Sequence, residues 1–162
     1  IRMEARAENE FPAAGRDEIE FVVAPNPGQP GRPLRKIASG GELARISLAI
    51  EVAAIGSDDV PVMVFDEVDS GIGGATAEVV GRKLRELGSR RQVLCVTHLA
   101  QVAAQGHQHI AVRKSVANGQ THTRFDAIEA KARIDEIARM LGGAEITSAT
   151  RSAAKELIAA AR

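Results

Sequence analysis

The sequence has almost no aromatic side chains. It contains no Trp and no Tyr, and aromatic residues make up 2% of its 162 positions. Single-stranded nucleic acids bind by stacking their bases on aromatic rings, so a base-stacking platform is not expected. Lys plus Arg equals Asp plus Glu at 21 each, and the chain therefore lacks the basic excess that binding along many DNA phosphates requires. DNA binding is not expected to centre on this chain.

The sequence also lacks the features of a disulfide-bonded or membrane protein. Cys95 is the single cysteine, so no internal disulfide can form, and its apolar neighbours predict a buried, unreactive thiol. No apolar run approaches the ~20 residues that a membrane-spanning helix needs. We therefore expect a cytoplasmic protein with no membrane partner. Because the chain begins with Ile1 rather than methionine, we also expect it to be a fragment.

The remaining pattern is that of a single domain whose character changes near its first quarter. Residues 1–8 predict a half-buried strand and residues 19–23 a second strand. Residues 25–33 hold four of the six prolines, which excludes a helix or a central strand there. We therefore describe residues 1–36 as strands with a Pro/Gly-rich excursion, and residues 37–162 as the main part of the domain.

The main part alternates strands and helices. Continuous apolar runs at residues 62–65 and 93–96 predict buried parallel strands, and residues 43–55 predict a buried helix. A helix connecting the two strands has the predicted inner face Ala77, Val80, Leu84 and Leu87. Strand, helix and strand at this spacing form a βαβ crossover.

The last third of the chain predicts a hairpin and two helices. Asn118-Gly119 is flanked by residues 109–114 and 120–125, which indicates a hairpin with a loop slightly longer than two residues. Two amphipathic helices follow, the second from about Thr147. The predicted fold class is α/β, with a parallel sheet core, flanking helices and a β-hairpin.

The first group of residues with chemical potential is Ser39-Gly40-Gly41-Glu42, at the start of the predicted helix. Ser39 and Glu42 have the spacing of a capping box, which is a structural explanation for both. It leaves the glycines unexplained, since each costs about 1 kcal/mol relative to alanine inside a helix. Glycines at a helix N-terminus let a phosphate approach the backbone amides. The motif is therefore also a candidate phosphate contact.

The second group is Asp66-Glu67, directly after an apolar strand. Sheets of this class bind their ligands at the carboxyl ends of the strands. Asp66 could hold Mg²⁺ directly or through water, because that ion prefers oxygen ligands. Glu67 could orient or deprotonate a water that attacks a γ-phosphate. The alternative is a strand that ends in two solvated acids.

The third candidate is His98, which follows the second apolar strand. It could donate a hydrogen bond to a phosphate or to the attacking water, or it could be a structural histidine. Cys95 and His98 do not form a credible zinc pair, because no second pair of ligands follows. His107, His109 and His122 likewise lack a companion cysteine or carboxylate cluster.

In their order along the chain, these groups resemble the C-terminal lobe of an ABC-type ATPase head. Residues 37–43 match the family's signature motif, and residues 62–67 match its Walker B strand with the catalytic glutamate. Residues 70–73 fall at the D-loop, and His98 falls at the switch histidine. Gly73 departs from the general pattern, because it stands where the D-loop aspartate is expected.

The resemblance narrows to the RecN family, which are SMC-like bacterial ATPases of DNA double-strand-break repair. Four stretches carry it: residues 25–43, 65–74, 96–103 and 136–143. RecN-like proteins have a Walker A phosphate-binding motif far upstream, beyond a long coiled coil, and this sequence does not contain that motif. The resemblance therefore implies that residues 1–162 are the C-terminal half of a head.

The resemblance implies a mechanism that uses ATP and Mg²⁺. Two heads form a homodimer with ATP between them, and each head is completed by the N-terminal Walker A lobe of its own parent chain. The residues implied to face the γ-phosphate on the opposite head are Ser39, Gly40, Gly41 and Glu42. Those implied for the nucleotide of their own head are Asp66 as the metal ligand and Glu67 and His98 as catalytic residues. Ser70 and Gly71 are implied to bind ATP from the D-loop region.

Several expectations follow for the fragment and its parent. DNA is expected to bind the parent protein in the nucleoid, mainly through other segments, and the fragment alone is expected to hydrolyse ATP negligibly. Half of a shared sheet is expected to expose an apolar edge or face. Two alternatives stay open, namely a non-catalytic ABC-like dimerisation module and a nucleotide-binding subunit of an ABC transporter.

Overall fold

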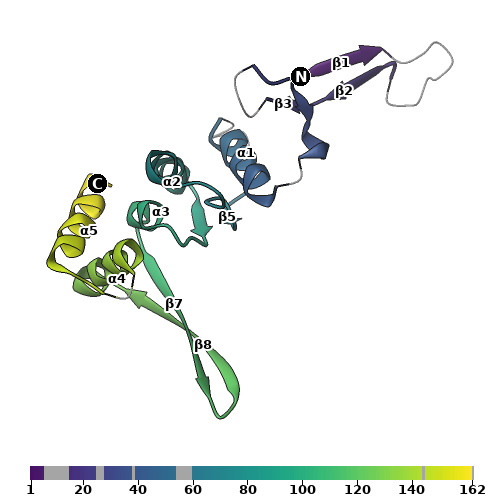
Figure 1. The fold of residues 1–162 in the computed structure, drawn as a ribbon. Helices are drawn as coiled ribbons and strands as arrows, with labels where there is room; N and C mark the ends of the chain where they lie inside the picture. Colours follow the sequence, from purple (N-terminus) through teal and green to yellow (C-terminus); the bar gives the residue numbers. More distant parts are fainter. Residues whose placement is uncertain (6–14, 25–27, 38, 54–59, 144, 162) are drawn as a thin grey trace. The chain divides into compact units, whose positions relative to one another are not determined.

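The computed structural model describes residues 1–5, 15–24, 28–37, 39–53, 60–143 and 145–161. It divides the chain into two compact units, Ile1–Ser39 and Gly40–Arg162, and the ribbon in Figure 1 follows their elements in chain order. No described helix combines the length and the apolar character needed to cross a membrane.

The first unit contains two small antiparallel sheets. In one, β1 (Arg2–Ala5) pairs with β2 (Asp17–Glu20). In the other, β3 (Val22–Val23) pairs with β4 (Arg32–Pro33), and a single 3₁₀ turn, η1 (Leu34–Lys36), follows. The expected half-burial of the first strand is wrong, because every residue of β1 is exposed. None of the described residues of this unit is buried, so they provide no core against which β1 could pack.

The second unit begins with a βαβ crossover and a helix before it. Helix α1 (Gly40–Ala53) precedes strand β5 (Val62–Phe65), helix α2 (Gly74–Gly88) and strand β6 (Gln92–Cys95). The two strands are parallel, with Val62 opposite Gln92 and Phe65 opposite Cys95, as the sequence predicts. The predicted inner face of α2 is confirmed, since its four residues are all buried: Ala77, Val80, Leu84 and Leu87.

Burial of this first core is one-sided, which corrects two expectations. Helix α1 buries Leu48, but Leu43 and Ile50 are 39% and 53% exposed, so it is not a fully buried helix. The strands likewise bury one face only. Side chains alternate between the faces of a strand, and one set packs on the core: Met63, Phe65, Val93 and Cys95. The opposite set is exposed: Val62, Val64, Leu94 and Val96.

The rest of the second unit surrounds a smaller core. Short helix α3 (Ala100–Gln105) leads into the hairpin of β7 (His109–Ala117) and β8 (Gln120–Ile128), and helices α4 (Ala130–Gly142) and α5 (Ser148–Ala160) follow. Helix α5 begins next to Thr147, close to the predicted start, and the Thr147 side chain caps it. The core residues come from α3, α4 and α5: Ala100, Ala104, Ile137, Ala138 and Ala154.

The hairpin loop is shorter than expected. Ala117 pairs with Gln120, so the loop consists of Asn118 and Gly119 alone. Both have positive φ, at 54° and 74°, which is the backbone of a type I′ turn. Asparagine and glycine tolerate this conformation best, and the twist of such a turn matches that of the strands.

Candidate functional site

The predicted catalytic groups lie at one edge of the parallel strand pair. Asp66 and Glu67 follow β5 directly, and His98 follows β6 after two further residues. The pairing continues past the strand ends, because the Val96 amide donates to the Phe65 carbonyl at 2.9 Å. Parallel strands end at the same edge of a sheet, so the structure brings the two groups to one edge, where all three side chains are exposed.

Glu67 has an unusual backbone. Its φ is 57°, in the left-handed region that costs a non-glycine residue about 1–2 kcal/mol. Its amide donates to Asp66 Oδ1 at 2.9 Å, and its carbonyl accepts from the Ser70 amide at 2.9 Å. The chain therefore turns sharply at Glu67, and the loop that follows runs back across the strand end. Strained residues of this kind concentrate at functional sites.

The two glycines of α1 pack against this loop. A Cβ atom added to Gly41 would lie 2.9 Å from Ser70 Cβ and 3.1 Å from the Glu67 carbonyl oxygen. A Cβ atom on Gly40 would lie 2.5 Å from the Glu67 carboxylate. Close packing against this loop therefore explains why glycine is found at both positions. The sequence did not show this reason, which adds to the predicted phosphate contact. The glycines place the first turn of α1 directly beside the strand end that carries Glu67.

Arg45 ties α1 to the same loop. Its guanidinium donates to the Ser70 carbonyl at 2.8 Å and to the Val68 carbonyl at 3.3 Å. Arg45 lies one helical turn after Gly41, so the first two turns of α1 and the loop after β5 are joined by both packing and hydrogen bonds. Sequence analysis missed this residue, because an arginine in a helix gives no local sign of what it bonds.

Asp69 is a second residue that sequence analysis missed. It is 2% exposed and joins the two strand ends. Its Oδ2 accepts from the Thr97 hydroxyl at 2.5 Å and from the His98 amide at 3.1 Å, and it lies 3.3 Å from His98 Nδ1. The sequence did show a third acidic residue, two positions after the pair Asp66-Glu67. Only tertiary contacts distinguish it from a solvated loop residue.

Cys95 is half-buried and not fully buried as the sequence predicts, but its thiol has the raised pKa of an unreactive cysteine. Burial, followed by the negative charges of Asp69 and Asp66, raises the pKa of Cys95 to about 12. Reactive cysteines need a lowered pKa and a cationic neighbour. Cys95 is therefore part of the packing under the site and not a nucleophile.

The remaining predicted site residues lie around the same loop or border it in sequence. Ser70 packs beside Gly41, and Gly71 has a φ of 71° and is exposed. Glu42 lies in the first turn of α1. Ser39 is the last residue of the first unit and precedes Gly40 in the chain, so its place among these groups stays a prediction.

The donor set at the strand end suits Mg²⁺ better than a fully protein-ligated metal. In the part of the chain that the structure describes, no three His, Cys, Asp or Glu side chains group as a metal site. Mg²⁺ usually binds through one or two carboxylates, with waters and substrate phosphates completing its shell. Asp66 is exposed and uses one oxygen to accept the Glu67 amide. Its carboxylate fits that role.

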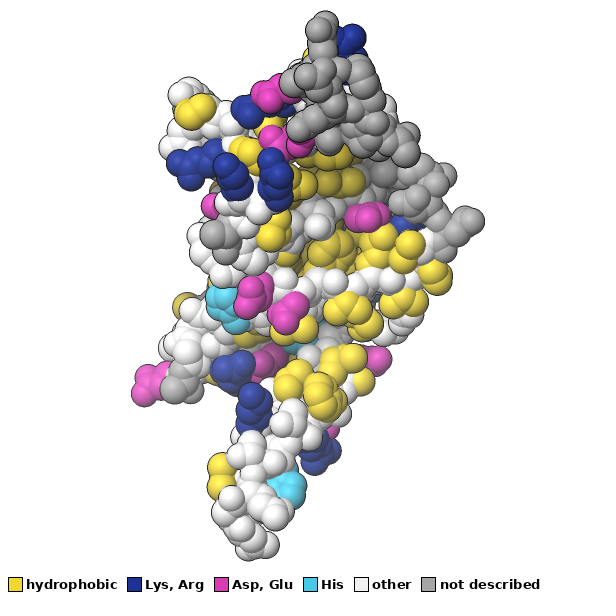
Figure 2. Space-filling view, turned by 90° about the vertical axis from the view of Figure 1, so that its right-hand side faces the viewer, with side chains coloured by type: hydrophobic (Ala, Val, Ile, Leu, Met, Phe, Trp, Pro, Cys, Tyr) yellow, Lys and Arg dark blue, Asp and Glu magenta, His cyan; other side chains and the backbone are white. Residues whose placement is uncertain are grey.

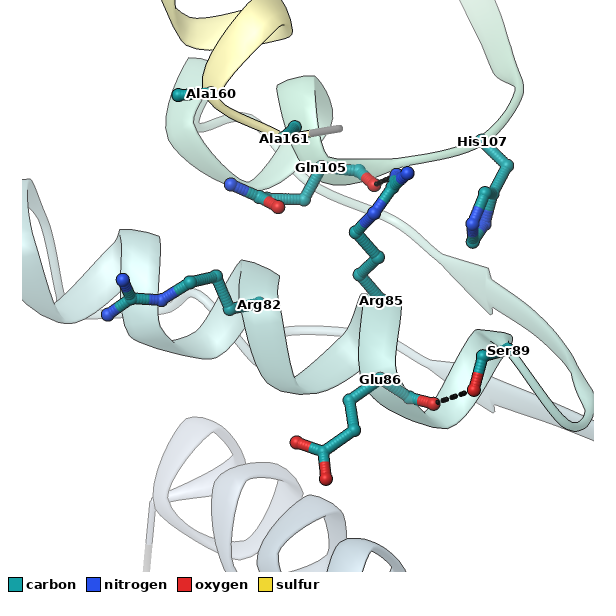
Figure 3. A pocket seen from close by; sticks show the side chains of 8 residues that line it. All are labelled: Arg82, Arg85, Glu86, Ser89, Gln105, His107, Ala160 and Ala161. Carbon is teal, nitrogen blue, oxygen red and sulfur yellow. Dashed lines mark hydrogen bonds between the residues drawn. The ribbon is translucent and has the colours of Figure 1, made fainter.

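A separate hollow of about 380 Å³ lies between α2, α3 and α5 (Figure 3). None of the predicted site residues lines it. Arg85, which lines the hollow, has a structural role, because its side chain donates to the Gln105 carbonyl at 2.7 Å. Arg133 similarly donates to the carbonyls of Ala104 and Gly106. These arginines satisfy the C-terminal carbonyls of the short helix α3, as cations at a helix C-terminus do.

Comparison with known proteins identifies the family of this chain. No protein-family model matches the chain. DNA repair protein RecN of Xylella fastidiosa (strain Temecula1) is 56% identical over 158 residues, which is 98% of this chain. The chain belongs to the RecN family. RecN of Vibrio cholerae is 52% identical over 91% of the chain, and RecN of Bacillus subtilis is 40% identical over 89%.

The chain spans about a quarter of the length of these RecN relatives, from 28% for Xylella fastidiosa to 25% for Bacillus subtilis. Their full activities therefore belong to much longer proteins. The alignment with RecN of Xylella fastidiosa covers 98% of this chain, so nearly all of the residues described above lie in the aligned segment.

Solved structures confirm the fold class. The Smc head domain with a coiled coil and joint from Pyrococcus yayanosii matches with a TM-score of 0.60 at 22% identity, covering 84% of this chain and 25% of that one. A chain from a study of ATP-driven dimerisation of SMC ATPases matches with a TM-score of 0.53 at 20% identity, covering 88% and 83%. The RecN segment thus has the α/β fold of an ABC-type ATPase head.

Proposed function

We propose that this RecN segment supplies the signature motif, the Walker B carboxylates and the switch histidine of an ATP-hydrolysing head. The observation that carries the proposal is the packing of Gly40 and Gly41 against the loop that begins with Glu67. A helix N-terminus suited to an anion and a strand end suited to metal and water thereby lie side by side. RecN relatives and SMC head folds support the same assignment.

Each residue has a distinct role in the proposal. Asp66 holds Mg²⁺, directly or through water, and that ion offsets the charge of the ATP phosphates. Glu67 positions the attacking water and accepts its proton, since an exposed carboxylate at a strand end is a suitable base. His98 forms a hydrogen bond with the attacking water. Ser70 and Gly71 form part of the D-loop region, where Ser70 lies beside Gly41 of α1.

The signature residues act on the opposite head. Ser39, Gly40, Gly41 and Glu42 form the N-terminal end of α1, and we propose that they contact the γ-phosphate bound by a second copy of the protein. ATP then lies between two heads, and its hydrolysis releases them. DNA binding is assigned mainly to other parts of the parent protein, because the net charge of this chain is zero.

The exposed face of the strand pair indicates where the rest of the head binds. Val62, Val64, Leu94 and Val96 are 44–67% exposed, although they sit on parallel strands, which normally have both faces covered. Hydrophobic side chains gather on the face shown in Figure 2. We propose that the N-terminal, Walker A lobe of the parent chain covers these strands and brings the phosphate-binding loop to the strand ends.

The test is ATP hydrolysis by the chain alone, by the chain mixed with the upstream lobe, and by the mixture with Glu67→Gln. The chain alone should be inactive, the mixture should hydrolyse Mg²⁺-ATP, and Glu67→Gln should abolish turnover while ATP still binds. Circular dichroism of the variant checks that it is folded.

A folded mixture that binds ATP without hydrolysing it would refute the catalytic assignment. If that mixture nevertheless dimerises with ATP, the segment serves as a dimerisation module. Wild-type turnover by Glu67→Gln would instead show that another group activates the water.

A further inference from the structure

The buried carboxylate of Asp69 makes an unusual set of contacts. A single oxygen, Oδ2, faces the Thr97 hydroxyl, the His98 amide and His98 Nδ1. The loop is fixed on both sides of Asp69, because Arg45 binds the carbonyls of Val68 and Ser70. The backbone that carries the carboxylate is therefore held in place by its own loop, independently of the His98 side chain.

The contact with the imidazole is different in kind from the other two. Thr97 and the His98 amide belong to the chain leaving β6, and bonding them ties two strand ends together. The His98 side chain is 73% exposed, so it contributes little to packing. An exposed imidazole without a partner rotates freely, and either ring nitrogen can carry the proton. A fixed carboxylate 3.3 Å from Nδ1 restricts the rotation of the ring and favours a proton on that nitrogen.

We propose that Asp69 is a positioning residue for His98, holding the ring with Nδ1 protonated and directing Nε2 outward toward the nucleotide. The inference deepens the proposed function and rests on it for the role of Nε2. Carboxylates bonded to the second nitrogen of a functional histidine fix its tautomer and orientation in this way. Asp69 does not touch the nucleotide itself, so it acts only through His98.

The kinetic test uses the full-length parent protein with Asp69→Asn, His98→Ala and the double variant. Asp69→Asn keeps an oxygen that can accept from Thr97 and from the His98 amide, so it preserves the tie between the strand ends, but it removes the negative charge that favours a proton on His98 Nδ1. It should lower kcat about tenfold with little change in the KM for ATP. The double variant should be no slower than His98→Ala, because a positioning residue has nothing left to position. Losses that multiply in the double variant would overturn the inference.

Thr97→Val is the matched control. It removes one donor to the same Oδ2 and leaves the His98 ring and its partner in place. Turnover should stay within about threefold of wild type, since the hydrogen bond from Thr97 to Asp69 supports the tie between the strand ends and does not touch the His98 ring. A loss as large as that of Asp69→Asn would show that the strand-end tie, and not the ring contact, is what matters.

A spectroscopic measurement separates this inference from the proposed function. The ¹⁵N signals of the His98 imidazole, assigned by their loss in His98→Ala, report which nitrogen carries the proton. Wild type should show the Nδ1-protonated tautomer, and Asp69→Asn should show a mixture. An unchanged tautomer overturns the inference whatever the turnover is. Full turnover by His98→Ala would instead refute the proposed role of His98, while the ¹⁵N result still decides whether Asp69 sets the ring.

Discussion

Gly40 and Gly41 stand next to each other but have different neighbours. The atom closest to an added Cβ at Gly40 is the end of the flexible Glu67 side chain, whereas Gly41 faces Ser70 Cβ and the Glu67 backbone. A side-chain end can rotate away, but a backbone carbonyl in a hydrogen-bonded turn cannot. The two positions should therefore differ in their tolerance of alanine.

We predict that Gly41→Ala lowers the free energy of unfolding by about 1–3 kcal/mol, as overpacking does. Gly40→Ala is the matched control and should cost much less, since Glu67 can move and alanine favours the helix. Urea unfolding followed by circular dichroism measures both. Equal losses would mean that the contact between α1 and the loop after β5 is looser than the structure shows.

Cys95 gives a second test at single-residue scale. With a pKa of about 12, its thiolate fraction near pH 8 is very small, so a thiol reagent should label the native protein at least about a hundredfold more slowly than the urea-unfolded chain. Asp69→Asn removes one of the charges that raise the pKa and should therefore speed labelling. Labelling of the native wild type at the unfolded rate would contradict the burial of Cys95.

At the scale of elements, the apolar pattern predicted type and order well. The buried side of α2 follows directly from its spacing, because Ala77, Val80, Leu84 and Leu87 all turn to the same core. Burial of whole elements was not predictable in the same way. Residues 43–55 and 62–65 carry apolar side chains on several sides. An apolar composition alone does not say which of those sides a neighbouring element covers.

The candidate site was predictable to the extent that it depends on strand ends. Asp66, Glu67 and His98 stand at the ends of recognisable apolar strands, and the parallel crossover brings those ends to one edge. Asp69 and Arg45 act through contacts far apart in sequence, to Thr97 and Ser70. Such contacts leave no periodic pattern, which is why the residues that hold the site were found only in the structure.

The start of β7 provides a pH-dependent test of how the hairpin joins α4. Burial, followed by the positive charge of Arg133, lowers the pKa of His109 below its ordinary value of 6.5, while Glu136 acts in the opposite direction. The unfolded chain therefore takes up this proton at a higher pH than the folded chain. Stability is complete above pH 6.5 and is lost as the pH falls toward the folded pKa.

We predict that the free energy of unfolding of wild type falls between pH 7.5 and pH 5, and that His109→Gln shows a smaller fall. Gln keeps a polar side chain but does not titrate. His122→Gln, at an exposed position of β8, is the control and should behave as wild type. Urea unfolding at the two pH values measures the difference, and identical slopes for wild type and His109→Gln would contradict the prediction.

At the scale of the whole molecule, the exposed strand face should govern solution behaviour. Val64 and Leu94 are opposite each other in the register of β5 and β6 and are 67% and 44% exposed. Exposed apolar patches on parallel strands promote association. The proposed upstream lobe would bury the same side chains.

We predict that the chain alone self-associates and that Val64→Ser with Leu94→Ser reduces this association. Val79→Ser is the matched control, because Val79 is 46% exposed on α2, outside this face, and it should change nothing. Light scattering measures the mass, and binding of the upstream lobe should be weakened by the double substitution only. Unchanged binding would show that the lobe does not cover this face.

The left-handed backbone of Glu67 has a consequence for how the sequence can drift. Asparagine or glycine would relieve the backbone at that position, so selection for thermostability alone should drive a population of variants away from glutamate. Selection for ATP hydrolysis by the whole head, the function proposed above, should hold it there. A library randomised at the codon for position 67 would measure both effects. The quantity to compare is how often glutamate is retained under each selection.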